Sequence, residues 1–427
     1  MSKKQMEKQE SLDDFEVIYE RCCGLDVHKK QITACLITPS SDGRPKREVR
    51  TFGTMTEDLL ALHDWLLDNQ CTHVAMESTG VYWKPVYNIL EGSFKLLLVN
   101  AQHIKAVPGR KKTDKLDAIW IARLLRVGLL KGSFIPAPEI RELRDLVRYR
   151  TTLIREKARE IQRVQKILED TNIKLSSVAT DINGVSARAI LNSLIAGKTD
   201  PESLAELAKG RLRNKIPELQ KALRGVVKPH HRLLLSELLA HIEYIEESIA
   251  RLNAEIEERM RPFAKQAQDL ATIPGLKEFI PQIIISEVGV NLSSFPSDKH
   301  FASWVGVCPG KNESAGKNKS GKTKKGNSWL KSALIQAAWA ASRTKDTYLS
   351  ALFHRLVGRL GKKKALVAVA HAIAVIIYHV LTKSIPYYEL GADYFIKLNR
   401  KSMERKLVRR LEELGYKVTL EEAESAA

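Results

Sequence analysis

The chain of 427 residues has few cysteines, no apolar N-terminal leader and almost no long apolar run. Its five cysteines are odd in number and lack paired metal-site spacing, so we expect buried, reduced thiols in a cytoplasmic protein. The polar and charged stretch Met1 to Glu10 is not a secretory signal. One nearly apolar stretch, Ala365 to Leu381, is at the short limit for a membrane span. Histidines and a tyrosine interrupt it, so we predict a buried helix of a soluble domain.

Acidic residues are outnumbered by basic ones. The chain has 69 Lys and Arg against 50 Asp and Glu, a formal net charge of +19. Such an excess favours a polyanionic partner, and nucleic acid comes before a membrane surface because no amphipathic anchor stands out. The length predicts two or three domains with substantial cores.

Carboxylates stand at four informative positions in the first third of the chain. Asp26 and Glu77 each end or interrupt a short apolar run, as residues do at the mouth of a sheet. Asp114 and Asp117 are three residues apart at the start of a helical pattern, so they project from one face of one helix. Four acids brought together repel one another unless a cation binds, and such hard oxygen ligands suit Mg²⁺ or Mn²⁺. In a chain this basic, a pair of these ions indicates phosphodiester chemistry.

The order of apolar blocks predicts the fold of this first part. Three strands are expected first, and then helix, strand, helix, strand and an acidic helix, which is the order of a ribonuclease H-like, RuvC-like α/β domain. The rest of the chain is expected to be mainly helical, so the fold class is α/β plus α. The expected boundaries are a disordered leader at 1–15, the catalytic domain at 16–135, a helical region at 136–265, a C-terminal domain at 266–400 and a charged tail at 401–427.

Two long amphipathic patterns follow the acidic helix. Ile140 to Asp170 and His231 to Met260 carry narrow apolar stripes and many charges, which favours an antiparallel coiled coil or a dimerising arm. An ordinary helical bundle explains them about equally well. Further on, Ala271 to Leu276 leads into the helical stretch Phe279 to Val288 and is typical of half a helix-hairpin-helix. The turn at Gly275 would there present backbone amides to a phosphate.

The segment from Gly310 to Gly326 holds six lysines, four glycines, two serines and one acid. It cannot pack as core, but glycine lets a chain approach a phosphate backbone and lysine neutralises its charge. A solvated loop that aids solubility is the alternative. With Gly275, the predicted nucleic-acid-binding residues are Lys111, Lys112, Lys311, Lys317, Lys319, Lys322, Lys324 and Lys325.

Several motifs together resemble the IS110 family of insertion-sequence transposases, the DEDD recombinases that include pilin-gene invertases. The motifs are Gly24 to Lys30 (GLDVHKK), Met76 to Trp83 (MESTGVYW), Lys112 to Ala118 (KTDKLDA), Ile273 to Gly275 (IPG), Phe301 to Pro309 (FASWVGVCP), the Lys/Gly segment with Ser314, Gly391 to Phe395 (GADYF) and Leu414 to Tyr416 (LGY). The resemblance runs from about residue 20 to residue 420, and none of the four acids departs from the family pattern.

The resemblance implies a RuvC-like domain holding two metal ions at Asp26, Glu77, Asp114 and Asp117, and a C-terminal transposase domain with a nucleophilic serine. That serine is Ser314, five residues after the turn that ends at Pro309. It also implies a homo-oligomer, dimer or tetramer, in which one protomer's serine completes another's acidic site. A structured RNA from the element's own ends would guide the enzyme to donor and target DNA.

The residues themselves leave alternatives open. Ser320 and Ser328 compete with Ser314, which has no sequence-local histidine to activate it. His28 lies two residues after Asp26, but it is expected to open a turn and stays outside the catalytic set. The favoured function is a metal-dependent DNA recombinase. A junction-resolving endonuclease with water as nucleophile, or a non-catalytic nucleic-acid-binding scaffold, are the alternatives.

Overall fold

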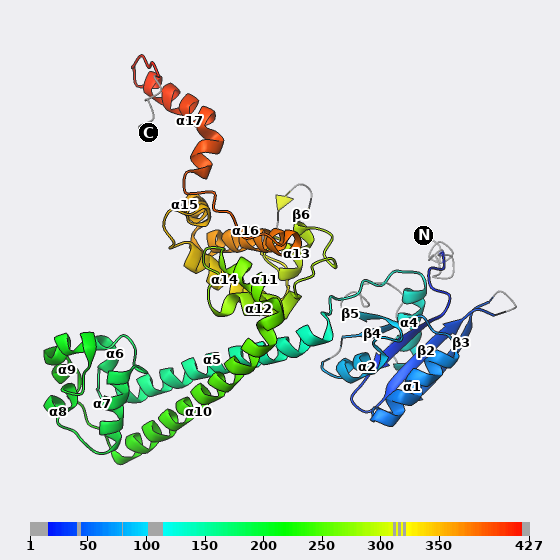
Figure 1. Cartoon of the computed structure of the whole chain (residues 1–427), viewed down its shortest axis with the longest axis horizontal. Helices are drawn as coiled ribbons and strands as arrows, with labels where there is room; N and C mark the ends of the chain where they lie inside the picture. The colour runs from blue at the N-terminus through cyan, green and yellow to red at the C-terminus, as the bar shows by residue number, and fades with distance from the viewer. Residues whose placement is uncertain are drawn as a thin grey trace, which may run out of the picture. The chain divides into compact units, whose positions relative to one another are not determined.

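The computed structural model divides the chain into two compact units, Met1–Ile135 and Pro136–Ala427, each of which is described by itself (Figure 1). The described residues are 16–40, 44–78, 80–100, 114–310, 313–314, 317–318 and 322–420, with backbone alone at 114, 313, 314, 317, 318 and 399–403. The predicted leader at 1–15 lies outside the described residues.

The first unit is built on a five-stranded sheet with the order β3-β2-β1-β4-β5. Its elements are β1 (Cys22–Val27), β2 (Ile32–Thr38), β3 (Lys46–Phe52), α1 (Thr56–Asp68), β4 (His73–Glu77), α2 (Trp83–Leu90), β5 (Lys95–Val99) and α4 (Asp114–Arg126). The β1–β2 and β2–β3 pairs are antiparallel, whereas β4 pairs in parallel with both β1 and β5. The predicted mixed α/β fold with a helical C-terminal part is therefore confirmed, and the RuvC-like assignment stays a prediction.

Both faces of this sheet are covered, which explains why β1 is apolar at nearly every position. Alternate residues of a strand point to opposite faces. Cys23 and Leu25 pack in a core with residues of α1 and α2, whereas Cys22 packs in a second core with residues of α4. The one charged residue of β1 is Asp26, and it lies on the α4 side by the same alternation.

The second unit is helical. Its α-helices are α5 (Pro138–Asp170), α6 (Leu175–Val178), α7 (Val185–Ile195), α8 (Pro201–Ala205), α9 (Ile216–Ala222), α10 (Pro229–Met260), α11 (Ala264–Ala271), α12 (Phe279–Val288), α13 (Asp298–Val305), α14 (Ser328–Ala341), α15 (Tyr348–Leu360), α16 (Lys362–Lys383) and α17 (Tyr394–Glu413). Two short 3₁₀ helices span Gly210–Lys215 and Arg261–Phe263, and two short strands are β6 (Glu313–Ser314) and β7 (Lys317–Asn318).

The long helices α5 and α10 lie side by side and run antiparallel (Figure 1). Contacts between them pair the start of one with the end of the other. These pairs are Glu142 with Arg259, Arg150 with Asn253, Lys157 with Glu246, Glu160 with His241 and Asp170 with His231. The two amphipathic stripes thus meet within one chain, and the coiled-coil geometry itself stays a prediction.

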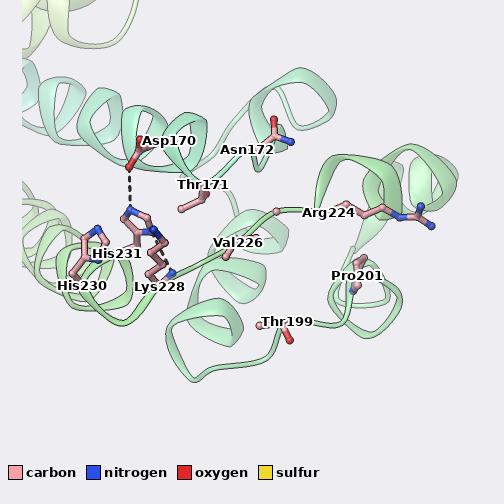
Figure 2. A pocket seen from close by; sticks show the side chains of 11 residues that line it. Asp170, Thr171, Asn172, Thr199, Pro201, Arg224, Val226, Lys228, His230 and His231 are labelled. Carbon is pink, nitrogen blue, oxygen red and sulfur yellow. Dashed lines mark hydrogen bonds and ion pairs between the residues drawn. The ribbon is translucent and has the colours of Figure 1, made fainter.

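A small helical lobe, α6 to α9, connects the far ends of α5 and α10 around an apolar core that it shares with both helices. Figure 2 shows a pocket there, with the side chain of His231 of α10 directed at Asp170 of α5. His231 Nδ1 accepts from the Lys228 backbone N–H at 3.3 Å, so Nε2 carries the proton that is donated to Asp170 Oδ2 at 3.0 Å. This contact ties α10 to α5 at the end of the arm.

The apolar stretch predicted as a buried helix forms α16. Within the described residues, it is the one helix long and apolar enough to cross a membrane, which on its own is weak support for a span. Its apolar positions, such as Val369, Ile373 and Ile377, are buried in the second unit, and α16 packs against α13, α14 and α15. That packing fits the expected core helix. Beyond it, α17 runs without a break from the expected C-terminal domain, which ends at 400, into the expected charged tail at 401–427.

The cysteines are free thiols, four of them buried and Cys308 half-buried. Burial raises the pKa of Cys22 and Cys71 to about 12 and that of Cys35 to about 11, and it raises the pKa of Cys23 as well. Because the thiolate is the reactive form, a raised pKa lowers reactivity at pH 8. Burial also raises the pKa of Cys308, but this half-buried thiol is more accessible to a reagent than the four buried ones.

We therefore expect a disulfide reagent at pH 8 to modify at most one thiol of the native protein rapidly, and that thiol is Cys308. Counting released chromophore before and after denaturation checks this, with Cys308→Ser as the control that should abolish the fast phase. Rapid reaction of two or more thiols in the folded protein would contradict the described burial.

Candidate active site

Two of the four predicted metal ligands lie at the ends of adjacent parallel strands. In the β1–β4 pairing, Leu25 stands opposite Met76, and Asp26 and Glu77 are the next residue on each strand. Asp26 is 8% exposed, and Glu77 is half-buried. Side chains at the same ends of neighbouring parallel strands meet at one edge of the sheet, so the two carboxylates are close neighbours in this unit.

Both carboxylates also lie on the face of the sheet that α4 covers. Cys22 and Ala75 belong to the core shared with α4. Asp26 is four residues beyond Cys22, and Glu77 is two residues beyond Ala75, so strand alternation keeps them on that face. The helix that carries Asp114 and Asp117 is thus on the same side as Asp26 and Glu77.

The direction of α4 brings its acidic first turn toward Asp26. The carbonyl of Arg126 accepts from Ile18 N at 2.9 Å, before β1 begins, and Cys22 Sγ lies 3.7 Å from the Ala122 carbonyl. The helix α4 therefore runs antiparallel to β1. From Gly24 to Asp26 the strand advances about 6.6 Å, and a helix covers that distance in about four residues. Four residues back from Ala118, which Gly24 contacts, is the first turn of α4.

Gly24 makes this approach possible. A Cβ atom at this position would lie 2.4 Å from Ala122 N and 2.5 Å from Ala118 O, both backbone atoms of α4. The helix backbone thus rests directly on the strand backbone. Gly24 belongs to the motif Gly24 to Lys30, and nothing in the sequence indicates which helix it contacts.

The side chain of Asp26 contacts His28, a residue outside the predicted catalytic set. His28 Nε2 lies 3.1 Å from Asp26 Oδ2, and His28 is about half exposed. His28 opens the turn, as expected, and its backbone N–H donates to the Gln31 carbonyl there. The imidazole can orient one oxygen of Asp26.

The donor types fit a divalent metal, since carboxylate oxygens are the ligands that Mg²⁺ and Mn²⁺ prefer. Asp26, Glu77 and Asp117 have described side chains, whereas that of Asp114 is not described. Among the side chains that the structure describes, no three Asp, Glu, His or Cys residues gather closely enough to form a metal cluster. The metal site stays a prediction.

Ser314 lies in the second unit, on an antiparallel pair of strands. Ser314 pairs with Lys317 in the β6–β7 ladder. Nearer the base, Pro309 bridges to Thr323, and Gly310 N donates to the Lys322 carbonyl at 2.9 Å. The backbone of the predicted nucleophile thus lies at the far end of a loop whose two arms pair with each other.

Two glycines lie in contact at the base of this loop. A Cβ on Gly326 would lie 2.5 Å from Gly306 N, and one on Gly306 would lie 2.9 Å from Gly326 N. Gly306 has a φ of +84°, which glycine adopts without strain. The two ends of the segment therefore touch backbone to backbone, and we call residues 306–326 the serine segment.

The predicted nucleic-acid-binding residues are described in part. Lys322, Lys324 and Lys325 are exposed on the serine segment, Lys317 is described by its backbone alone, and Lys111, Lys112, Lys311 and Lys319 lie outside the described residues. Gly275 has a φ of +86°, and a Cβ there would lie 2.3 Å from the Ala337 carbonyl of α14. Close packing against α14 thus accounts for glycine at this turn, and phosphate binding stays a prediction.

Comparison with known proteins identifies the class. Residues 23–173 match the DEDD transposase domain of IS110, and residues 267–354 match the transposase IS116/IS110/IS902 family. The first match contains β1, β4 and α4, and the second contains the serine segment. An enzyme of the DNA transposase class is thus indicated by both units.

Individual relatives agree with this class. The chain is 24% identical over 320 residues to a probable family 20 transposase of Pseudomonas aeruginosa, covering 74% of this chain and 85% of that protein. It is 24% identical over 297 residues to the transposase for insertion sequence element IS1111A of Coxiella burnetii, covering 68% and 72%. It is 24% identical over 384 residues to the pilin gene-inverting protein of Moraxella lacunata, covering 85% and 96%. The chain belongs to the IS110 family of transposases.

The contact of α4 with Gly24 generates a prediction. Gly24→Ala would place a methyl group against backbone atoms that cannot yield without moving α4, and overpacking of this kind costs about 1–3 kcal/mol. We expect a lower free energy of unfolding of the first unit and loss of DNA joining. Denaturant unfolding and a joining assay measure the two effects.

The matched control is Gly358→Ala in α15, where a Cβ meets nothing within 4 Å. Alanine is favoured over glycine inside a helix by about 0.5–1 kcal/mol, so this variant should unfold at equal or higher denaturant. Wild-type stability and activity in Gly24→Ala would contradict the described contact.

Proposed function

We propose that this transposase cleaves and rejoins DNA strands by a serine-DNA intermediate, with two divalent ions held by Asp26, Glu77, Asp114 and Asp117. The observation that carries the proposal is the placement of Asp26 and Glu77 at adjacent strand ends, on the face where α4 directs its acidic first turn. Bound there, Mg²⁺ or Mn²⁺ would supply the positive charge that lowers the barrier to phosphodiester cleavage.

Ser314 is the proposed nucleophile. Its Oγ attacks the phosphorus, the bond from phosphorus to the 3′ oxygen breaks, and the serine proton is lost while the 3′ oxygen leaves as a hydroxyl. The resulting 5′-phosphoserine conserves the ester bond energy, so a 3′ hydroxyl can later attack it and regenerate the serine. Simple hydrolysis would lose that energy. The location of Ser314 at the end of a projecting strand pair suits attack at a site outside its own unit.

The partners of the enzyme are donor and target DNA together with a guide RNA, which the family resemblance supports. The net charge of +19 and the exposed lysines of the serine segment fit both nucleic acids. A homo-oligomer, dimer or tetramer, would let the serine of one protomer meet the acids of another. We place the enzyme in the cytoplasm and assign it no membrane partner.

The test is junction sequencing in bacteria that carry the gene with its flanking element DNA. We expect excised circles and insertion joints from the wild type, and none from Asp26→Asn, Asp117→Asn or Ser314→Ala. A chelator should abolish cleavage by the purified protein, and a protein–DNA adduct should form only when Ser314 is present.

Matched controls separate the roles of these residues. Asp64→Asn removes an exposed carboxylate of α1, while Ser320→Ala and Ser328→Ala remove the competing hydroxyls, and all three should retain joints. Cleavage by Ser314→Ala would reject the serine and favour water as the nucleophile, as in a junction-resolving endonuclease. Normal joints from Asp26→Asn would reject the acidic site.

The lysines give a separate prediction. Changing Lys322, Lys324 and Lys325 together to alanine should lower the slope of log binding constant against log salt by about 2–3, because each lost phosphate contact removes about 0.7–0.9. Fluorescence anisotropy over a salt series measures it. The control triple is Lys362 to Lys364, an equally exposed run at the start of α16. Equal loss of slope in both triples would contradict a specific role for the serine segment.

A further inference from the structure

We propose that Glu287 is a positioning residue for the serine segment, acting through Asn327 at the point where that segment joins α14. The proposal rests on the proposed function only in taking Ser314 as the group that must be positioned. The geometry that points to it is a buried carboxylate that accepts hydrogen bonds both from the long helix α5 and from Asn327 at the junction.

Glu287 is a buried charge near the end of the apolar helix α12, with its side chain 1% exposed. Burying a carboxylate is costly unless it is paired. Arg148 of α5 pairs with it in two parallel hydrogen bonds, Nε to Oε1 at 2.6 Å and Nη2 to Oε2 at 2.7 Å. This fork is among the strongest and most directional ways to hold a carboxylate.

A third donor completes the site. Asn327 Nδ2 donates to Glu287 Oε2 at 2.6 Å. The carboxylate accepts only, so it must face the NH₂ end of the Asn327 amide, and the amide oxygen is directed away from it. The Glu287 charge thereby selects one of the two orientations of this amide.

The selected orientation is the one that begins α14. Asn327 Oδ1 accepts from the backbone N–H groups of Trp329 and Leu330, both at 3.0 Å. These are helix N–H groups that no helical carbonyl can reach, and an asparagine side chain is a preferred acceptor for them. With the amide reversed, two NH₂ hydrogens would face two N–H donors.

The same residue closes the base of the serine segment. Asn327 N donates to the Trp304 carbonyl at 3.1 Å, next to the contact between Gly306 and Gly326. Lys331 Nζ, one turn into α14, donates to Thr323 Oγ1 at 2.6 Å. The chain that leaves α13 and the chain that enters α14 are therefore fastened together at Asn327.

The long helix α5 supplies the fixed side of this arrangement. Arg144 donates from Nε to the Ser286 carbonyl at 3.1 Å and from Nη2 to the Glu287 carbonyl, which satisfies carbonyls at the end of α12. Arg148 and Arg155 also lie over the Trp329 ring, with their guanidinium carbons 5.4 and 5.0 Å from its centroid. Glu287 thus connects the α5 arm to the base of the segment that presents Ser314.

The test exchanges donor and acceptor between the two side chains. Asn327→Asp alone sets a second carboxylate against Glu287, whereas Glu287→Gln with Asn327→Asp restores one amide facing one carboxylate with little change in volume. The double variant keeps the Arg148 Nε bond to the side-chain oxygen but loses the Arg148 Nη2 bond, because Oε2 is the atom that the glutamine NH₂ replaces. Asn327→Ser is a milder variant, since serine keeps the helix cap but its hydroxyl stops one bond short of the amide nitrogen. The charge control is Glu142→Gln, an exposed acid that pairs with Arg259 between α5 and α10.

Two readouts are taken on the full chain with and without DNA: hydrogen exchange of the backbone over 304–330, and the rate of protein–DNA adduct formation. In Asn327→Asp we expect exchange to become about tenfold faster or more and adduct formation to become slower by a similar factor. A hydrogen bond to a charged group contributes enough free energy for such a change. Asn327→Ser should change both less, and the double variant should recover both in part, because one of the two Arg148 bonds stays lost.

Unchanged exchange over 304–330 in both single variants of Asn327, or no recovery in the double variant, would overturn the proposal. Changes in exchange and adduct rate in Glu142→Gln as large as those in Asn327→Asp would also overturn it. If Ser314→Ala still joins DNA, the nucleophile assignment fails, but faster exchange in Asn327→Asp with recovery in the double variant would still support the positioning role. A purely structural requirement predicts loss of stability without recovery by the exchange of groups.

Discussion

The direct contact between the backbones of β1 and α4 is the constraint on which the proposed chemistry depends. Gly24 leaves no side chain between them, so the helix lies as close to the sheet as backbone atoms permit. Because α4 runs against the direction of β1, its first turn approaches the strand end where Asp26 lies. A residue with a side chain at position 24 would separate the acids of the helix from those of the sheet.

The second unit solves a different problem, which is to hold a polar, glycine-rich segment in place. Residues 310–326 cannot supply an apolar core of their own, and hydrophobic burial therefore cannot order them. Val307 is buried at the base of the serine segment, and the other contacts described there are polar or between backbones: Gly306 against Gly326, the cap by Asn327 and the buried Glu287 that accepts from Arg148. Hydrogen bonds and close backbone contacts at the base thus order this segment, as hydrophobic packing orders the helices.

Much of the fold could be predicted from the sequence, because apolar blocks delimit the elements. The bounds of α12 agree with the expected Phe279 to Val288, and the first unit has the expected order of strands and helices. The sequence left open whether the two long helices form a coiled-coil arm or part of a helical bundle, because an apolar stripe does not indicate which helix it packs against. The contact of Arg148 with Glu287 joins residues 139 apart, and no local pattern indicates it. Gly24 illustrates the same limit, because its role depends on which helix covers that face.

The acidic site is the central claim, and anomalous diffraction from crystals of the full chain grown with Mn²⁺ tests it most directly. The account predicts anomalous peaks at ligand distance from carboxylate oxygens of Asp26 and Glu77, with Asp114 or Asp117 completing the shell, and their loss in Asp26→Asn. Peaks confined to other carboxylates, or none under conditions where the protein cleaves DNA, would contradict it.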